Sequence, residues 1–118
     1  MKTDELTGAA LDWAVSHCVE WSRKFPIMPF KVLPYSTDWA QGGPIIEREK
    51  IGVWWATHYV DDDGVEYGNH WYAEPACTDD NADKPYRVAV GPTPLITAMR
   101  CYVASKLGDE VELPKELL

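Results

Sequence analysis

The stretch Ile51–Ala73 reads IGVWWATHYVDDDGVEYGNHWYA. Residues 51–60 are rich in the aromatic and β-branched residues that favour strands. Residues 61–64, Asp-Asp-Asp-Gly, are a turn signal, and residues 65–73 can return antiparallel to the first segment. Alternation places Val53, Trp55, Thr57 and Tyr59 on one face of the first strand, and Trp71 and Ala73 on one face of the second. The sequence therefore predicts an antiparallel hairpin.

One helix is expected before this hairpin in the sequence and one after it. The first begins after Thr7, with Leu6 and Leu11 placed for a hydrophobic staple, and its pattern fails at Pro26. The second has Thr93 as N-cap and Pro94 as its first residue, and it ends at Gly108. The apolar stripe of the second helix comprises Leu95, Ile96, Met99, Tyr102, Val103 and Leu107.

A third short strand is expected over residues 86–90, and residues 110–113 could add an edge strand. The sequence thus predicts an α+β fold in which two helices pack on one face of an antiparallel sheet of three to four strands. A length of 118 residues, 46% of them hydrophobic, indicates one domain over residues 1–118.

The chain shows no targeting or membrane signal. No apolar run approaches the ~20 residues that span a bilayer, and residues 1–5 do not resemble a signal peptide, so we expect a cytoplasmic protein. The three cysteines lack paired spacing and are expected to be free thiols. Cys18 and Cys101 lie within helical patterns and are expected in the core.

The net charge of −8 arises in the middle of the chain, because residues 61–83 contain eight acidic residues and no Lys or Arg. This distribution repels nucleic acid, and no basic patch supports nucleic-acid binding. The acidic stretch either mimics the phosphate charge of DNA and so occupies a DNA-binding partner, or it forms two solvated loops.

Two segments are candidates for ligand binding. Residues 35–44 read as a loop whose aromatic rings, polar side chains and double glycine suit a planar polar ligand. In the alternative, Trp39 only fills a small core. The start of the second helix, preceded by Lys84 and Arg87, suits an anion through its free backbone N–H groups, although an ordinary capped helix explains it as well. We expect the two segments to meet around one cavity.

Motifs for catalysis, metals and cofactors are lacking. The chain has no Gly-x-Ser-x-Gly, no Cys assigned to a His, and no GxGxxG. His58, His70 and Cys77 could meet only in a favourable hairpin register, and no metal-ligand spacing is present. We therefore expect a protein without cofactor or metal and, on balance, without enzymatic activity; a small enzyme acting on a nucleotide is the remaining alternative.

Three segments together resemble a known family. They are residues 6–15 (LTGAALDWAV), 35–46 (YSTDWAQGGPII) and 91–111 (GPTPLITAMRCYVASKLGDEV). They are similar to the NinX-like family of small proteins from tailed phages and prophages. This resemblance implies a phage or prophage origin and action in the bacterial host cytoplasm, and it implies no particular reaction.

The leading hypothesis is a phage accessory protein that binds a small anionic or nucleotide-like ligand without catalysis. The alternative is an acidic, aromatic interaction module that inhibits a host protein. A homodimer is also expected, because so aromatic a small domain exposes apolar surface. The expected ligand-binding residues are Tyr35, Ser36, Thr37, Asp38, Trp39, Gln41, Gly42, Gly43, Arg87, Gly91, Thr93 and Arg100.

Overall fold

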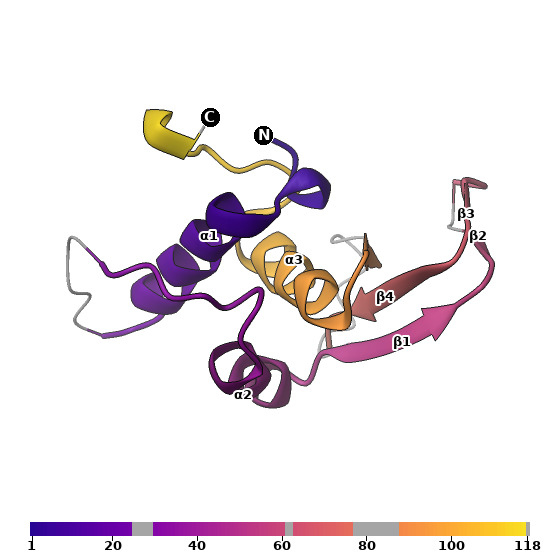
Figure 1. Ribbon diagram of the computed structural model, residues 1–118, viewed down its shortest axis with the longest axis horizontal. Helices are drawn as coiled ribbons and strands as arrows, with labels where there is room; N and C mark the ends of the chain where they lie inside the picture. Colours follow the sequence, from indigo (N-terminus) through magenta and orange to yellow (C-terminus); the bar gives the residue numbers. More distant parts are fainter. Residues whose placement is uncertain (25–29, 61–62, 77–87, 118) are drawn as a thin grey trace.

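The fold is an α+β arrangement of three α-helices and a three-stranded antiparallel sheet, as expected, with one helix more than the sequence indicated (Figure 1). The computed structural model describes residues 1–24, 30–60, 63–76 and 88–117. Within them, the helices are α1 (Gly8–Trp21), α2 (Trp39–Glu49) and α3 (Pro94–Leu107), and the 3₁₀ turns are η1 (Thr3–Glu5) and η2 (Lys115–Leu117). The strands are β1 (Gly52–Ala56), β2 (Tyr59–Val60), β3 (Glu66–Tyr67), β4 (His70–Glu74) and β5 (Ala89–Gly91).

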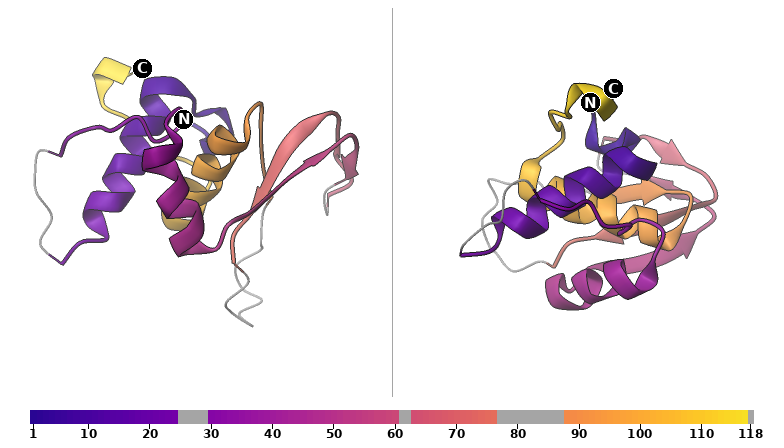
Figure 2. Two further views of the ribbon diagram at one scale, coloured as in Figure 1. Left: turned by 60° about the horizontal axis from the view of Figure 1, so that its bottom comes forward. Right: turned by 60° about the vertical axis from the view of Figure 1, so that its left-hand side comes forward.

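Helix α3 lies at the centre of the molecule. It contacts all three strands of the main sheet on one side and packs against α1 and α2 on the other (Figures 1 and 2). Its buried residues are Leu95, Thr97, Ala98, Met99, Cys101, Tyr102 and Val103. They surround most of the helix, as expected for an element covered on several sides. The core of the domain is therefore built around α3.

Sequence signals at the helix ends are mostly confirmed. Thr93 Oγ1 accepts a hydrogen bond of 3.1 Å from the Ile96 N–H, and Gly108 ends α3 with a φ of 85°. Thr7 occupies the N-cap of α1, although its side chain forms no capping hydrogen bond. Leu6 and Leu11 are both fully buried, as the staple requires.

The hairpin is confirmed, with a break in each predicted strand. The main sheet has the order β1-β4-β5, and its register pairs Val53 with Ala73 and Trp55 with Trp71. Strands β2 and β3 form a separate two-stranded tip. Because Val53 and Ala73 belong to the core, their face of the sheet is the one covered by α3. On the opposite face Trp54 stacks on Tyr72, with ring centroids 5.9 Å apart.

The later strands differ slightly from the prediction. The third strand is Ala89–Gly91, so it ends one residue beyond the predicted segment, whose residues 86 and 87 lie outside the described part. Residues 110–113 form only an isolated bridge between Glu110 and Lys2. This bridge and two hydrogen bonds between Met1 and Val111 hold the two ends of the chain together. Cys18 and Cys101 are buried free thiols as expected, and Cys77 lies outside the described residues.

The prediction of a loop over residues 35–44 is wrong from Trp39 onward, where α2 begins. Asp38 caps this helix, because its Oδ1 accepts a 2.9 Å hydrogen bond from the Ala40 N–H. Pro44 lies inside α2 and removes one backbone donor, a loss that the helix tolerates on its exposed side. The helix forms despite two glycines because its inner side packs on α3.

None of the described helices is long and apolar enough to cross a membrane.

Candidate functional site

A cavity of about 300 Å³ lies where η1, the start of β4, β5 and the start of α3 come together. We call it the Arg100 cavity. Its lining residues are Asp4, His70, Val88, Val90, Gly91, Pro92 and Arg100. Gly91 and Arg100 were expected at a ligand site from the sequence, and the other five were not.

Arg100 is held rigidly at this cavity. Its Nε donates a 2.7 Å hydrogen bond to the Leu6 carbonyl oxygen, and its Nη1 donates a 2.8 Å bond to the Val90 carbonyl oxygen. Two bonds from one planar group fix both its position and its plane. Burial lowers the pKa of Arg100 and Asp4 raises it, and the guanidinium remains charged at neutral pH.

Gly91 allows β5 to approach α3 closely. A Cβ atom at this position would lie 2.5 Å from Thr97 Oγ1 and 3.3 Å from Arg100 Nη1. Any side chain here would therefore displace the Thr97 hydroxyl or push β5 away from α3. The glycine that the sequence suggested for anion binding has a clear packing role beside the cavity.

The cavity combines both signs of charge. Asp4 and Arg100 both line the cavity, so a carboxylate and a guanidinium are present in the same site. His70 adds an exposed imidazole. A carboxylate only accepts hydrogen bonds when ionised, whereas a guanidinium only donates them. The arrangement therefore suits a ligand that carries both donors and acceptors better than it suits a bare anion.

Most of residues 35–38 are buried or take part in hydrogen bonds that stabilise the fold. Tyr35 is only 8% exposed and Ser36 only 2% exposed, so the two rings of Tyr35 and Trp39 do not both face a ligand. The Ser36 N–H donates a 2.8 Å hydrogen bond to Asp12 Oδ1. Thr37 is exposed, and Asp38 serves as the cap of α2.

The first turns of α2 present a different surface. Trp39 is 55% exposed, so it does not fill a core, and Gln41 and Gly43 are partly exposed. Gly42 is buried against the first turn of α3, where an added Cβ would lie 2.6 Å from Leu95 Cδ1. The two candidate segments were expected to meet around one cavity, and instead α2 packs directly on α3 through Gly42 and Leu95. The Arg100 cavity is lined by no residue from 35 to 43.

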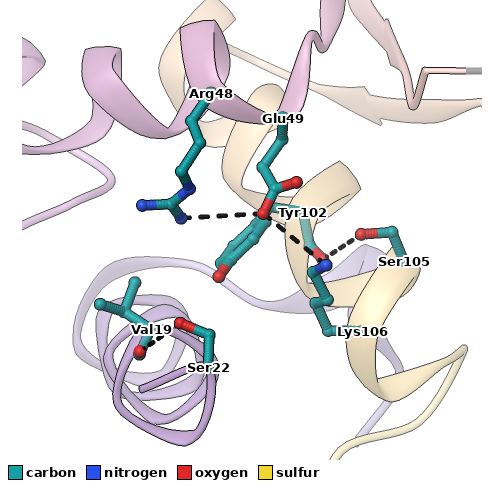
Figure 3. A network of polar contacts seen from close by, with 7 residues as sticks. All are labelled: Val19, Ser22, Arg48, Glu49, Tyr102, Ser105 and Lys106. Atoms are coloured by element: carbon teal, nitrogen blue, oxygen red, sulfur yellow. Dashed lines mark hydrogen bonds and ion pairs between the residues drawn. The ribbon is translucent and has the colours of Figure 1, made fainter. Parts of the chain in front are cut away.

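The far end of α2 is also fixed to α3 (Figure 3). Glu49 Oε1 lies 3.7 Å from Lys106 Nζ and 3.7 Å from Arg48 Nη2. The Tyr102 ring lies between these charged groups and the end of α1 that carries Val19, and burial raises its pKa to about 12. The Glu49–Lys106 ion pair therefore adds a contact between α2 and α3 at the end opposite to Gly42.

Thr93 and Arg87 are the remaining residues that were expected to bind a ligand. Thr93 lies at the start of α3, where its side chain caps the helix, and it does not line the cavity. Arg87 lies outside the described residues. His58 and His70 belong to no metal-binding cluster, since the described residues contain no group of three His, Cys, Asp or Glu side chains that could hold a metal ion.

Pro92 lies between the predicted Gly91 and Thr93, and the other four missed lining residues come from further away in the sequence or from the preceding strand. Asp4 reaches the cavity from the other end of the chain, and His70 approaches from the hairpin. Only the alternation of Val88 and Val90 hinted that these two share a face. No local pattern signals that Asp4, more than 80 residues before Val88, or His70 on the hairpin lies beside Arg100.

The family model described as Bacteriophage P22, NinX matches residues 2–106. No curated protein matches the sequence.

Proposed function

The chain belongs to the bacteriophage P22 NinX family, and we propose that this phage accessory protein binds a small nucleotide-like ligand in the Arg100 cavity. The observation that carries the proposal is the fixed guanidinium of Arg100 at the cavity wall. Its Nε and Nη1 are used by backbone carbonyls, and neither bond uses Nη2. We assign Nη2 to the ligand.

Asp4 narrows the class of ligand. An isolated phosphate would meet the repulsion of this carboxylate, which lines the same cavity as Arg100. A nucleobase supplies N–H donors for Asp4 and ring or carbonyl acceptors for Arg100. A cavity of about 300 Å³ is at the lower end of the usual size of ligand sites, which favours a mononucleotide over a larger cofactor.

The start of α3 provides a place for the negative group of such a ligand. Gly91 and Pro92 line the cavity directly before this helix, and Thr93 caps only the Ile96 N–H. Pro94 carries no N–H, and the Thr97 N–H donates to the Thr93 carbonyl oxygen, which leaves the Leu95 N–H of the first turn, and the helix dipole favours negative charge there. Base and phosphate would then be recognised at different walls.

Isothermal titration with nucleosides, nucleoside mono-, di- and triphosphates and inorganic phosphate tests this proposal. We expect at least one nucleotide to bind, and inorganic phosphate alone to bind far more weakly. Val88→Phe fills part of the cavity and should weaken binding about tenfold or more. His70→Ala should weaken it less, and His58→Ala is the matched control, because His58 lies outside the cavity on the same hairpin.

Heat from no member of the panel, or equal affinities for the unchanged protein and Val88→Phe, would count against the proposal. Unchanged circular dichroism of Val88→Phe ensures that a loss of binding reports the cavity and not unfolding.

A host-protein partner is the second candidate, favoured by the tip of the hairpin. Val60 is 46% exposed and Val65 is 49% exposed, and Asp63 and Glu66 are exposed beside them. A host protein with a basic surface matches this mixture of apolar and acidic groups. Affinity capture from bacterial lysate should retain such a protein at low salt and lose it in Asp63→Asn/Glu66→Gln. Retention by the double variant would contradict it. We propose that the protein acts in the cytoplasm of the bacterial host.

A further inference from the structure

Strand β1 forms one edge of the main sheet. It pairs with β4 on one side, and no other described strand pairs with its outer side. None of the residues of β1 is buried, whereas Tyr72 and Ala73 in the neighbouring β4 are fully buried. In Figure 1, β1 follows the outer rim of the hairpin, and α2 joins its start without running along it. Among the described residues, the outer edge of β1 is therefore left without a neighbouring strand.

The edge also lacks the features that usually prevent pairing. Natural edge strands are protected by charged side chains, prolines or bulges. The sequence of β1 is Gly-Val-Trp-Trp-Ala, with no charge and no proline, and Trp55 is 50% exposed. An accessible strand of this composition is a template for another strand.

We propose that β1 pairs antiparallel with β1 of a second copy of this chain, so that two three-stranded sheets form one six-stranded sheet. The two-fold axis passes beside Trp54, which then lies opposite the partner's Trp54. Val53 lies opposite the partner's Trp55, and by strand alternation both belong to the same face of the sheet, on which Val53 packs against the core. The inner and outer faces of the two sheets therefore continue across the interface.

A second copy fits this edge because the strand is complementary to itself. A two-fold interface brings each residue against a fixed counterpart, and every pair formed by β1 in this register is uncharged. The acidic excess of each copy lies in residues 61–83, outside the paired strand. A strand of five residues is ~17 Å long, and pairing over that length buries less than a standard interface. We therefore expect a reversible dimer with a micromolar dissociation constant.

Sedimentation velocity from micromolar to millimolar concentration tests the dimer. We expect the fraction of dimer to increase with protein concentration. It should increase further with salt, because salt screens the repulsion between two copies of net charge −8. A monomer throughout this range, at low and at high salt, would overturn the proposal.

Two variants locate the interface. Gly52→Lys adds an edge lysine without steric conflict, since the nearest atom to its Cβ, Glu74 Cγ, is 3.5 Å away. Trp55→Lys removes the apolar side chain that lies opposite Val53 of the second copy. Each change occurs twice in the dimer and should weaken association about tenfold or more while leaving the monomer folded.

Trp21→Lys and Trp39→Lys are the matched controls, because these tryptophans are 57% and 55% exposed and lie on α1 and α2. We expect both controls to dimerise like the unchanged protein. A dimer that dissociates in a control variant and persists in Gly52→Lys and Trp55→Lys would assign the interface to a helix and overturn the proposal. The ligand titration is independent of this result, because the Arg100 cavity contains no residue of β1.

Discussion

At the residue scale, Gly42 and Gly43 are neighbours in α2 with opposite surroundings. A Cβ on Gly42 would lie 2.5 Å from the Tyr35 carbonyl oxygen and 2.6 Å from Leu95 Cδ1. A Cβ on Gly43 would meet only Trp39 Cε3, at 4.0 Å. Gly42 is thus required by packing on α3, whereas Gly43 is not.

Gly42→Ala should lower the free energy of unfolding by about 2 kcal/mol, because the backbone oxygen of Tyr35 cannot move aside cheaply. Gly43→Ala is the control and should raise it by about 0.5–1 kcal/mol, since alanine is the better helix former. Urea denaturation followed by circular dichroism measures both. Equal effects of the two substitutions would show that α2 does not press on α3 at Gly42.

At the element scale, α1 and α3 both have a threonine at the N-cap position, and only one of the two side chains forms a capping hydrogen bond. Thr93 Oγ1 accepts from the Ile96 N–H, and the Thr7 side chain forms no capping bond. Leu6 and Leu11 are both fully buried beside the start of α1. The start of α1 is therefore secured by apolar packing, and that of α3 by a hydrogen bond.

Thr93→Ala should cost about 1 kcal/mol of stability, the usual value for a lost N-cap. Thr7→Ala should cost only a few tenths of that amount, because no capping bond is lost. Thermal denaturation of the two variants compares them directly. A larger loss for Thr7→Ala would mean that its hydroxyl stabilises α1 in solution.

At the scale of the whole molecule, the core contains groups that must stay neutral. Burial raises the pKa of Cys18 to about 11 from 9.0, that of Cys101 to about 12 from 9.0, and that of Tyr102 to about 12 from 10.0. All three lie where α3 packs on its neighbours. Folding therefore favours their protonated forms.

Stability should consequently fall in alkali. Each group has a higher pKa folded than unfolded, so its contribution is complete below the unfolded pKa and is lost as the pH rises through the folded value. The free energy of unfolding should be constant between pH 7 and pH 8, as far as these groups are concerned, and should decrease from about pH 9 upward. Denaturation with urea at a series of pH values measures this.

The double variant Cys18→Ala/Cys101→Ala is the control. It should begin to lose stability about one pH unit later, near the ordinary pKa of tyrosine. An identical pH dependence in this variant would show that the two thiols are not the cause.

The sequence by itself determined the hairpin, the three-stranded antiparallel sheet, the two helices that follow Thr7 and Thr93 and the buried thiols, because turn, helix-start and alternation signals act between residues close in the chain. Only the tertiary structure decided that residues 39–49 are a helix, since contact with Leu95 outweighs the local cost of two glycines and a proline. It also decided that Arg100 shares a cavity with Asp4 and His70. Such contacts join distant parts of the chain, and their energy exists only once α3 has been placed between the sheet and the other helices.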